Sequence, residues 1–165
     1  HTQLHPLLHG GGQENNFRSG TENISGVVGF ATALSLCQKE REQEGKRLLY
    51  LREKLTKGIL NSISQTSLNG HPTHRLPNHV SITFKNVEGE VLLLALDDHG
   101  IAASSGSACA SQSKEPSHVL QALGKSKNEA RSSIRFTLGH DTTEQDVEYI
   151  LTTLPDVIKK VKNHN

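Results

Sequence analysis

The chain has 165 residues, of which 33% are hydrophobic, a length and composition that suit one domain or a large piece of one. Its 18 basic and 17 acidic side chains leave a net charge of +1, and 4% of the residues are aromatic, which argues against binding to nucleic acid or to an anionic membrane. No apolar run approaches the roughly 20 residues of a membrane span, no signal peptide is visible, and two cysteines make no disulfide framework, so we expect a cytoplasmic protein.

The first third of the chain predicts a loop followed by helices. Residues 1–20 are rich in His and Gly, and glycine permits backbone angles that regular structure does not use. Apolar residues then recur at helical spacing over residues 27–34, with Thr21 or Asn23 as the expected N-cap. A second apolar stripe over residues 48–59 predicts a further helix.

Two residues between these apolar stripes carry expectations of their own. Gly45 is expected to separate the two helices, because glycine weakens the interior of a helix. Cys37 lies beside Leu34 and Leu36 on the first helix, so we interpret it as a packing residue.

The rest of the chain predicts strands interleaved with helices, which indicates a mixed α/β or α+β unit. Apolar and polar residues alternate in the strands, whereas Gly and Pro mark the loops. A capping box from Thr142 to Gln145 is expected to begin the last helix, and Pro155 to kink or interrupt it. In order, we expect a loop at 69–78, a strand at 80–84, a helix at 90–98, a short strand at 101–103, a loop at 104–114, a helix at 116–123, a strand at 134–138 and a final helix.

Cys109 is a candidate catalytic residue. Ser, Gly and Ala surround it in a segment without periodicity, which predicts a mobile loop over residues 104–114. A cysteine reacts as the thiolate and needs access to its target, and this setting offers access; an incidental loop cysteine is the alternative. The ten steps from Ser104 to Lys114 span roughly 35 Å when extended, so a thiol on this loop is able to visit two places, as a residue that carries a group must.

Arg135 is a candidate for binding a carboxylate. On the predicted strand it faces away from Ile134 and Phe136, so it points to solvent or to a cleft if those two residues point into the core. A guanidinium in a cleft binds a carboxylate through two parallel hydrogen bonds. An ordinary surface arginine is the alternative.

Two other patterns are weaker. Residues 10–21 place backbone N–H groups, Arg18 and hydroxyls just before a helix, which suits an anion such as phosphate, although a plain turn is the alternative. Ten histidines are present, but neither their loop cluster nor the spacing of His1, His5 and His9 completes a ligand set, so we expect no metal site.

Three blocks of the chain together resemble the cysteine desulfurases, the NifS- and IscS-like branch of the class-V aminotransferase superfamily. The similarity runs from about Leu7 to Val161. It is the order and joint presence of the blocks that is specific, since none is specific alone. In order they are HGGGQE (9–14) with RSGTEN (18–23), SSGSAC (104–109) with EPS (115–117) and LQALG (120–124), and SSIRF (132–136) with TTE (142–144).

The resemblance implies the C-terminal portion of a fold-type-I enzyme whose cofactor is pyridoxal 5'-phosphate (PLP). Residues 1–25 would end the large PLP-binding domain, and residues 26–165 would form the small α+β domain. L-cysteine would be the substrate, Cys109 would accept its sulfur as a persulfide, and Arg135 would hold its carboxylate. Thr21 would contact the PLP phosphate across a homodimer interface. The implied sulfur acceptor is an iron–sulfur scaffold protein or a tRNA thiolation pathway.

The chain departs from the family pattern in one important respect. The family's cofactor lysine lies in a Ser-x-His-Lys motif, and no lysine here follows a histidine. Because the chain opens with His1 and contains no Met, we interpret it as a fragment, inactive alone, with apolar surface exposed where the missing part would pack. Ala110, His118 and Pro155 are smaller departures. The alternatives are a non-enzymatic persulfide carrier and an inert truncated fragment.

Overall fold

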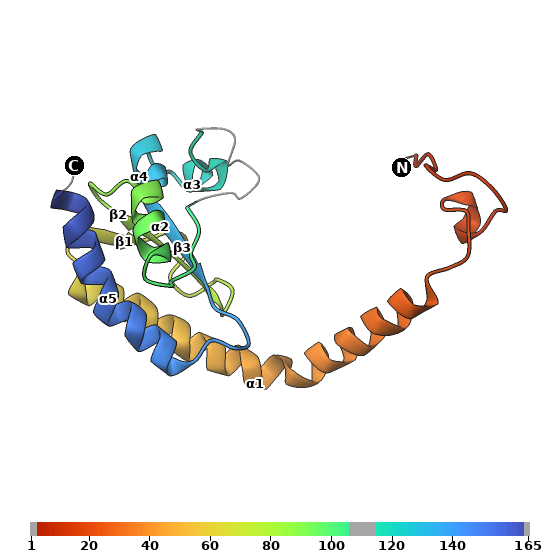
Figure 1. Ribbon diagram of the computed structural model, residues 1–165, viewed down its shortest axis with the longest axis horizontal. Coiled ribbons are helices and arrows are strands. Elements are labelled where there is room, and N and C mark those ends of the chain that lie inside the picture. The colour runs from red at the N-terminus through yellow and green to blue at the C-terminus, as the bar shows by residue number, and fades with distance from the viewer. Residues whose placement is uncertain (1–2, 106–114, 164–165) are drawn as a thin grey trace. The chain divides into compact units, whose positions relative to one another are not determined.

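A computed structural model describes residues 3–105 and 115–163 of the chain (Figure 1). Its contacts fall into two compact units, His1–Glu42 and Gln43–Asn165. The long helix α1, Ile24–Ser62, contributes residues to both units. Among the residues that the structure describes, none of the helices combines the length and the hydrophobicity that a membrane span requires.

The first unit contains a short 3-10 helix, η1 (Glu14–Asn16), and the first half of α1. The side-chain oxygen of Asn23 accepts a hydrogen bond of 3.0 Å from the Gly26 N–H, which is the N-cap expected for this helix. The predicted apolar stripe is present on α1 but is not covered within this unit. Its residues Val27, Phe30 and Leu34 are 62, 73 and 51% exposed.

Two expectations for the middle of α1 are wrong. The helix runs through Gly45 without a break, because one interior glycine costs only about 1 kcal/mol relative to alanine and the charged and amide residues that precede it favour a helix. Cys37 is exposed and does not pack in a core, because it lies on the part of α1 that the described residues of its unit leave uncovered.

The second unit is built on a three-stranded antiparallel sheet in the order β1-β2-β3. The strands are β1 (Thr66–Leu68), β2 (His79–Phe84) and β3 (Ser133–Thr137), and in their register Ser81 faces Arg135 and His79 faces Thr137. The helices are α2 (Gly89–Asp97), α3 (His118–Ala122), α4 (Lys127–Arg131) and α5 (Glu144–Asn163).

One hydrophobic core joins the sheet to the second half of α1, to α2 and to α5. Leu55 of α1, Ile82 of β2, Leu92 of α2 and Leu154 of α5 are all fully buried in it. Figure 1 shows α5 alongside the second half of α1, and Lys54 of α1 bonds to two glutamates of α5 at 2.5 and 2.6 Å. The second half of α1, α2 and α5 therefore pack against the core face of the sheet, and the predicted α/β class is confirmed.

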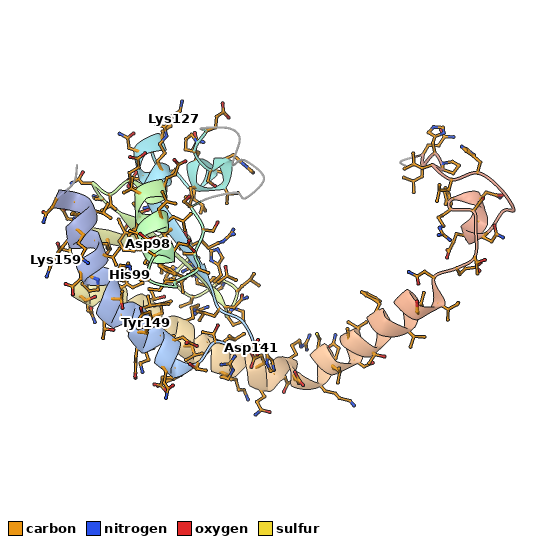
Figure 2. The ribbon with its side chains drawn as sticks, in the orientation of Figure 1. Asp98, His99, Lys127, Asp141, Tyr149 and Lys159 are labelled. Atoms are coloured by element: carbon orange, nitrogen blue, oxygen red, sulfur yellow. The ribbon has the colours of Figure 1, made fainter. Side chains whose placement is uncertain are left out.

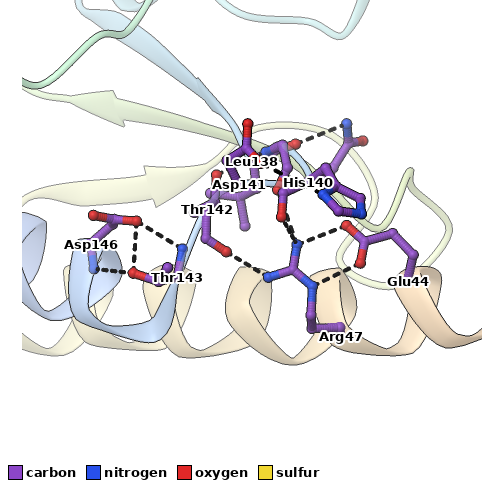
Figure 3. Close-up of polar contacts among 10 residues, drawn as sticks. Glu44, Arg47, Leu138, His140, Asp141, Thr142, Thr143 and Asp146 are labelled. Carbon is purple, nitrogen blue, oxygen red and sulfur yellow. Dashed lines mark hydrogen bonds and ion pairs between the residues drawn. The ribbon is translucent and has the colours of Figure 1, made fainter.

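A single arginine fastens the loop between β3 and α5 to helix α1 (Figure 3). The guanidinium of Arg47 donates to the carbonyl oxygens of Gly139, His140 and Thr142 at 3.1, 2.9 and 2.5 Å. The carboxylate of Glu44 accepts two further bonds from the same group, each 2.7 Å long. The hydrogen bonds between the two side chains lower the pKa of Glu44 and raise the pKa of Arg47, so both groups stay charged.

Several local expectations for the second unit need correction. Residues 101–103 form no strand; the chain makes only an isolated bridge between Ser104 and Arg135. The capping box of α5 uses Thr143 and Asp146, whose reciprocal bonds are 3.2 and 2.8 Å, because the Thr142 hydroxyl instead accepts a bond from the Gly139 N–H. Helix α5 also continues through Pro155 without interruption.

Candidate functional site

A cavity of about 460 Å³ lies where β2 and β3 meet helix α3 and the loop between β1 and β2. Its walls include two arginines, Arg75 and Arg135, together with four histidines. Aspartate and glutamate are absent from the described residues that line it. A cavity with cationic walls and without carboxylates favours an anionic ligand, because each guanidinium keeps its charge at any physiological pH.

Arg135 reaches this cavity from the side of β3 that faces away from the core. Its neighbours Ile134 and Phe136 are 0 and 3% exposed in the hydrophobic core, as the alternation predicted. The Arg135 Nε is buried and has no hydrogen-bond partner within the described part of the chain. The orientation expected for Arg135 is confirmed, whereas its role in binding a carboxylate stays a prediction.

The backbone of Arg135 also fixes the start of the segment that carries the candidate nucleophile. Arg135 N–H donates to Ser104 O at 2.7 Å, and Ser104 N–H donates to Arg135 O at 3.0 Å. Cys109 itself, with most of the predicted loop 104–114, lies outside the described residues. Ser104 precedes Cys109 by five residues in the sequence, and five residues of fully extended backbone span roughly 17 Å.

Arg75 is a second cationic residue of the cavity, and the sequence analysis missed it. Its Nη2 donates to the carbonyl oxygen of Asn69, whereas Nε and Nη1 are buried without partners among the described residues. Burial lowers the pKa of Arg75, and the positive charge of Arg52 lowers it further. The only sequence signal was an arginine in a loop bounded by Pro72 and Pro77.

His79 lies within reach of both arginines. It belongs to the same face of the sheet as Arg135, one diagonal position away in the register. Burial lowers the pKa of His79, and the charges of Arg75 and Arg135 lower it further. The neutral form of this imidazole is therefore favoured, so His79 adds little to the positive charge of the two guanidinium groups.

A buried polar network forms the floor of the cavity. The Asn69 side-chain amide donates to the hydroxyls of Ser81 and Ser133, both at 3.2 Å, and its oxygen accepts from Thr83 at 2.8 Å. Thr83 and Ser133 share a further bond of 2.8 Å. Asn69 thus joins β2 to β3 through its side chain and holds Arg75 through its carbonyl oxygen.

The glycine-rich segment in the first unit forms a compact turn. Arg18 Nη1 donates to the carbonyl oxygens of Gly20 and Thr21 at 3.2 and 2.6 Å, and Gly20 N–H donates to the Gln13 side chain at 3.1 Å. The Thr21 side chain is exposed, and Gly20 has a φ of 104°, a backbone conformation that glycine adopts without strain. This arrangement fits a phosphate group at Thr21, although Arg18 is occupied by the turn.

Thr21 and Arg135 belong to different units, so the structure describes each within its own surroundings. As for metals, no group of three or more His, Cys, Asp or Glu side chains in residues 3–105 and 115–163 is arranged to hold an ion. The two arginines and the histidines of the cavity are therefore the chemically distinctive cluster of the second unit.

The chain belongs to the aminotransferase class-V family, whose sequence profile matches residues 2–150. Proteins named cysteine desulfurase IscS are similar to it: that of Methanosarcina thermophila is 48% identical over 98% of this chain, and that of Dictyoglomus turgidum 47% over 98%. A NifS-like protein from Rickettsia africae has a similar structure, with a TM-score of 0.80 and 33% identity over 96% of this chain.

The predicted family and fold are thereby confirmed. The chain spans about 40% of the length of these relatives: 40% and 41% of the two IscS proteins and 41% of the Rickettsia protein. Enzymes of the class-V aminotransferase family depend on PLP.

Proposed function

We propose that this chain is part of a PLP-dependent cysteine desulfurase, which converts L-cysteine to L-alanine and leaves the sulfur as a persulfide on Cys109. The bridge between Ser104 and Arg135 carries the proposal, because it ties the segment with the nucleophile to the strand with the carboxylate-binding arginine. The names of the relatives support the same activity.

In this proposal Arg135 orients the substrate. Its guanidinium lines the cavity, and its buried Nε needs an acceptor that a carboxylate oxygen supplies. A substrate held by its carboxylate at the cavity wall lies within the roughly 17 Å reach of the Cys109 thiol. Binding at one fixed point thus brings two reacting sulfur atoms together.

Cys109 acts as the nucleophile of the transfer. Its thiolate forms a bond to the substrate sulfur while the bond between that sulfur and the substrate Cβ breaks. The bonding electrons pass to the organic part of the substrate, which takes up protons and leaves as L-alanine. The transferred sulfur is then a persulfide on Cys109, ready for a sulfur-acceptor protein such as an iron–sulfur scaffold or for tRNA thiolation.

PLP, when bound, supplies an electron sink that allows the carbon–sulfur bond to break. We propose that the Thr21 hydroxyl binds its phosphate from the neighbouring subunit of a homodimer. The lysine that holds the cofactor would come from a part of the longer protein outside this chain, since no lysine here follows a histidine.

We further propose that residues 1–25 end the large PLP-binding domain and that residues 26–165 form the small domain, in the cytoplasm. The exposed stripe of Val27, Phe30 and Leu34 supports packing against a further part of the complete protein, because side chains that are 51 to 73% exposed need a cover there.

The decisive experiment uses the complete protein that contains this chain, with PLP and L-cysteine. L-alanine should form, and mass spectrometry should find a persulfide on Cys109. The variant Cys109→Ala should abolish both, whereas Cys37→Ala, which removes the other cysteine, should change neither. An active Cys109→Ala variant would contradict the proposal. A persulfide that forms on Cys109 only when another persulfide-bearing protein supplies the sulfur would instead indicate a non-enzymatic persulfide carrier.

A further inference from the structure

Arg75 has the properties of a ligand-binding residue, although nothing in the sequence marked it. Both ends of the residue are fixed. Arg52, which is 3% exposed, donates to the carbonyl oxygens of Arg75 and Leu76 at 3.5 and 3.1 Å, and the Asn69 carbonyl holds the Arg75 side chain. A guanidinium held in this way loses little conformational freedom when it meets a ligand.

The two remaining donor atoms of Arg75 lack a partner among the described residues. Nε and Nη1 are shielded from solvent and make no hydrogen bond there, as is also true of Nε in Arg135. A buried charged donor without an acceptor is costly, because it has lost water and gained nothing. Both arginines line the same cavity, so an anion bound in this cavity has donors available from two sides.

The carboxylate that acts on Arg75 is already paired with another arginine. Glu53 is the carboxylate that acts on Arg75, and it is already bonded to Arg52 at 2.7 Å. The described residues of the cavity wall include no carboxylate, and the polar side chains of the cavity floor are occupied by the network around Asn69. In a shielded site of low dielectric, an unneutralised guanidinium acts strongly on an anion beside it.

We propose that Arg75 is a second carboxylate-binding residue of the cavity, so that the carboxylate of the amino-acid substrate lies between Arg75 and Arg135. This inference rests on the proposed function, and it adds a residue from the loop between β1 and β2 to the site. The Asn69 carbonyl is the positioning group for Arg75, and the same asparagine joins the two strands beneath the ligand.

The test measures binding to the complete protein without PLP, by isothermal titration with L-alanine and with L-alaninamide, which lacks the carboxylate charge. Arg75→Gln and Arg135→Gln should each weaken L-alanine binding by about ten- to a hundredfold, the range expected for a lost hydrogen bond to a charged group. Arg75→Lys keeps the charge but not the planar group, so its affinity for L-alanine should lie between those of the wild type and Arg75→Gln. Alaninamide should bind weakly to every form.

Lys159→Gln is the matched control for charge. This lysine lies on α5 with a side chain that is 77% exposed (Figure 2), and its loss should leave L-alanine binding unchanged. Wild-type affinity in Arg75→Gln with lost affinity in Arg135→Gln would overturn the role of Arg75 and leave the proposed function standing. Wild-type affinity in both variants would overturn the carboxylate site of the proposed function as well.

A measurement on the wild-type protein covers the case in which Arg75→Gln does not fold. The guanidinium Nε–H signals of Arg75 and Arg135 should both shift in NMR spectra when L-alanine is added, and neither should shift with alaninamide. A shift of the Arg135 signal alone would overturn the inference.

Discussion

The side-chain oxygen of Asn69 accepts a 2.8 Å hydrogen bond from the hydroxyl of Thr83, and both residues are almost fully buried, with exposed fractions of 2 and 0%. Asn69 precedes β2 by ten residues, so this bond fixes a loop against the sheet that it leaves. The same loop carries Arg75, so the Asn69 amide contributes to the stability of the cavity wall.

We predict that Asn69→Ala lowers the free energy of unfolding by about 2 kcal/mol, because it removes three side-chain hydrogen bonds and leaves buried hydroxyls with fewer partners. Urea denaturation of the two forms measures this difference. Ser64→Ala, at an exposed position just before β1, is the control and should change stability by less than about 0.5 kcal/mol. Equal effects of the two substitutions would contradict the importance of the network.

Arg47→Ala should detach the loop between β3 and α5 from helix α1. The substitution removes donors to three backbone carbonyls, and we expect it to cost about 1 kcal/mol, a modest value because the Arg47 side chain is 36% exposed. Arg47→Lys should recover part of the loss. Thermal unfolding measures the effect, and Lys46→Ala, at the exposed neighbouring position, should leave the melting temperature unchanged.

The ring of His79 should titrate below its ordinary pKa, because burial and the charges of Arg75 and Arg135 oppose protonation in the folded state. Between the folded and the unfolded pKa, the unfolded chain then binds more protons. The stability contribution of this histidine is therefore complete above the unfolded pKa of about 6.5 and is lost as the pH falls through the folded pKa.

NMR titration of the His79 ring protons gives this pKa directly. Arg75→Gln should raise it, because one of the two opposing charges is gone, while Lys159→Gln should leave it in place. A His79 pKa that is the same with and without Arg75 would show that the two groups are too distant to share a ligand.

Substitution of leucine by alanine should have very different effects on stability at different positions of helix α1. Leu55 is fully buried, so Leu55→Ala should cost about 2–5 kcal/mol through lost contacts and a cavity. Leu49, on the same helix, is 42% exposed, and Leu49→Ala should cost far less. Chemical denaturation of the complete protein compares the two, and similar losses would contradict the placement of the core.

The exposed stripe of α1 should govern how the chain behaves alone. Phe30 is 73% exposed, so Phe30→Ser should raise the solubility of the isolated chain by reducing self-association. In the complete protein the same substitution should lower stability, because there we expect Phe30 to be covered. Light scattering and thermal unfolding measure the two effects, and an isolated wild-type chain that stays monomeric at high concentration would count against the stripe as an interface.

Strands and helices were predictable where residues alternate or recur regularly. The strand with Ile134 and Phe136 was recognised together with the outward direction of Arg135. Short elements were not: β1 has three residues and α4 has five, too few for a period to show. The helix break predicted at Gly45 was wrong because a helix tolerates one glycine. The capping box was assigned to Thr142 and not to Thr143 because both adjacent threonines fit the pattern.

The site was predictable only in part, for a physical reason. Arg135 was accessible to sequence reasoning because a strand has two faces and the partner residues marked one of them. Arg75 lies in an irregular loop, where no periodic pattern indicates the direction of a side chain. Its importance comes from its bond to the Asn69 carbonyl and from two nitrogens that have no partner among the described residues. Such features arise from tertiary contacts and leave no pattern along the chain.

Under the proposed function, the two hydrogen bonds between Ser104 and Arg135 have a consequence for the local concentration of the Cys109 thiol, which follows five residues later in the sequence. A group tethered by five residues to a fixed point has an effective concentration in about the millimolar range or above. At such a concentration a thiol meets a bound substrate often without being held against it. Under the proposed function, this bridge would allow Cys109 to react at the cavity and then to leave it with the persulfide sulfur.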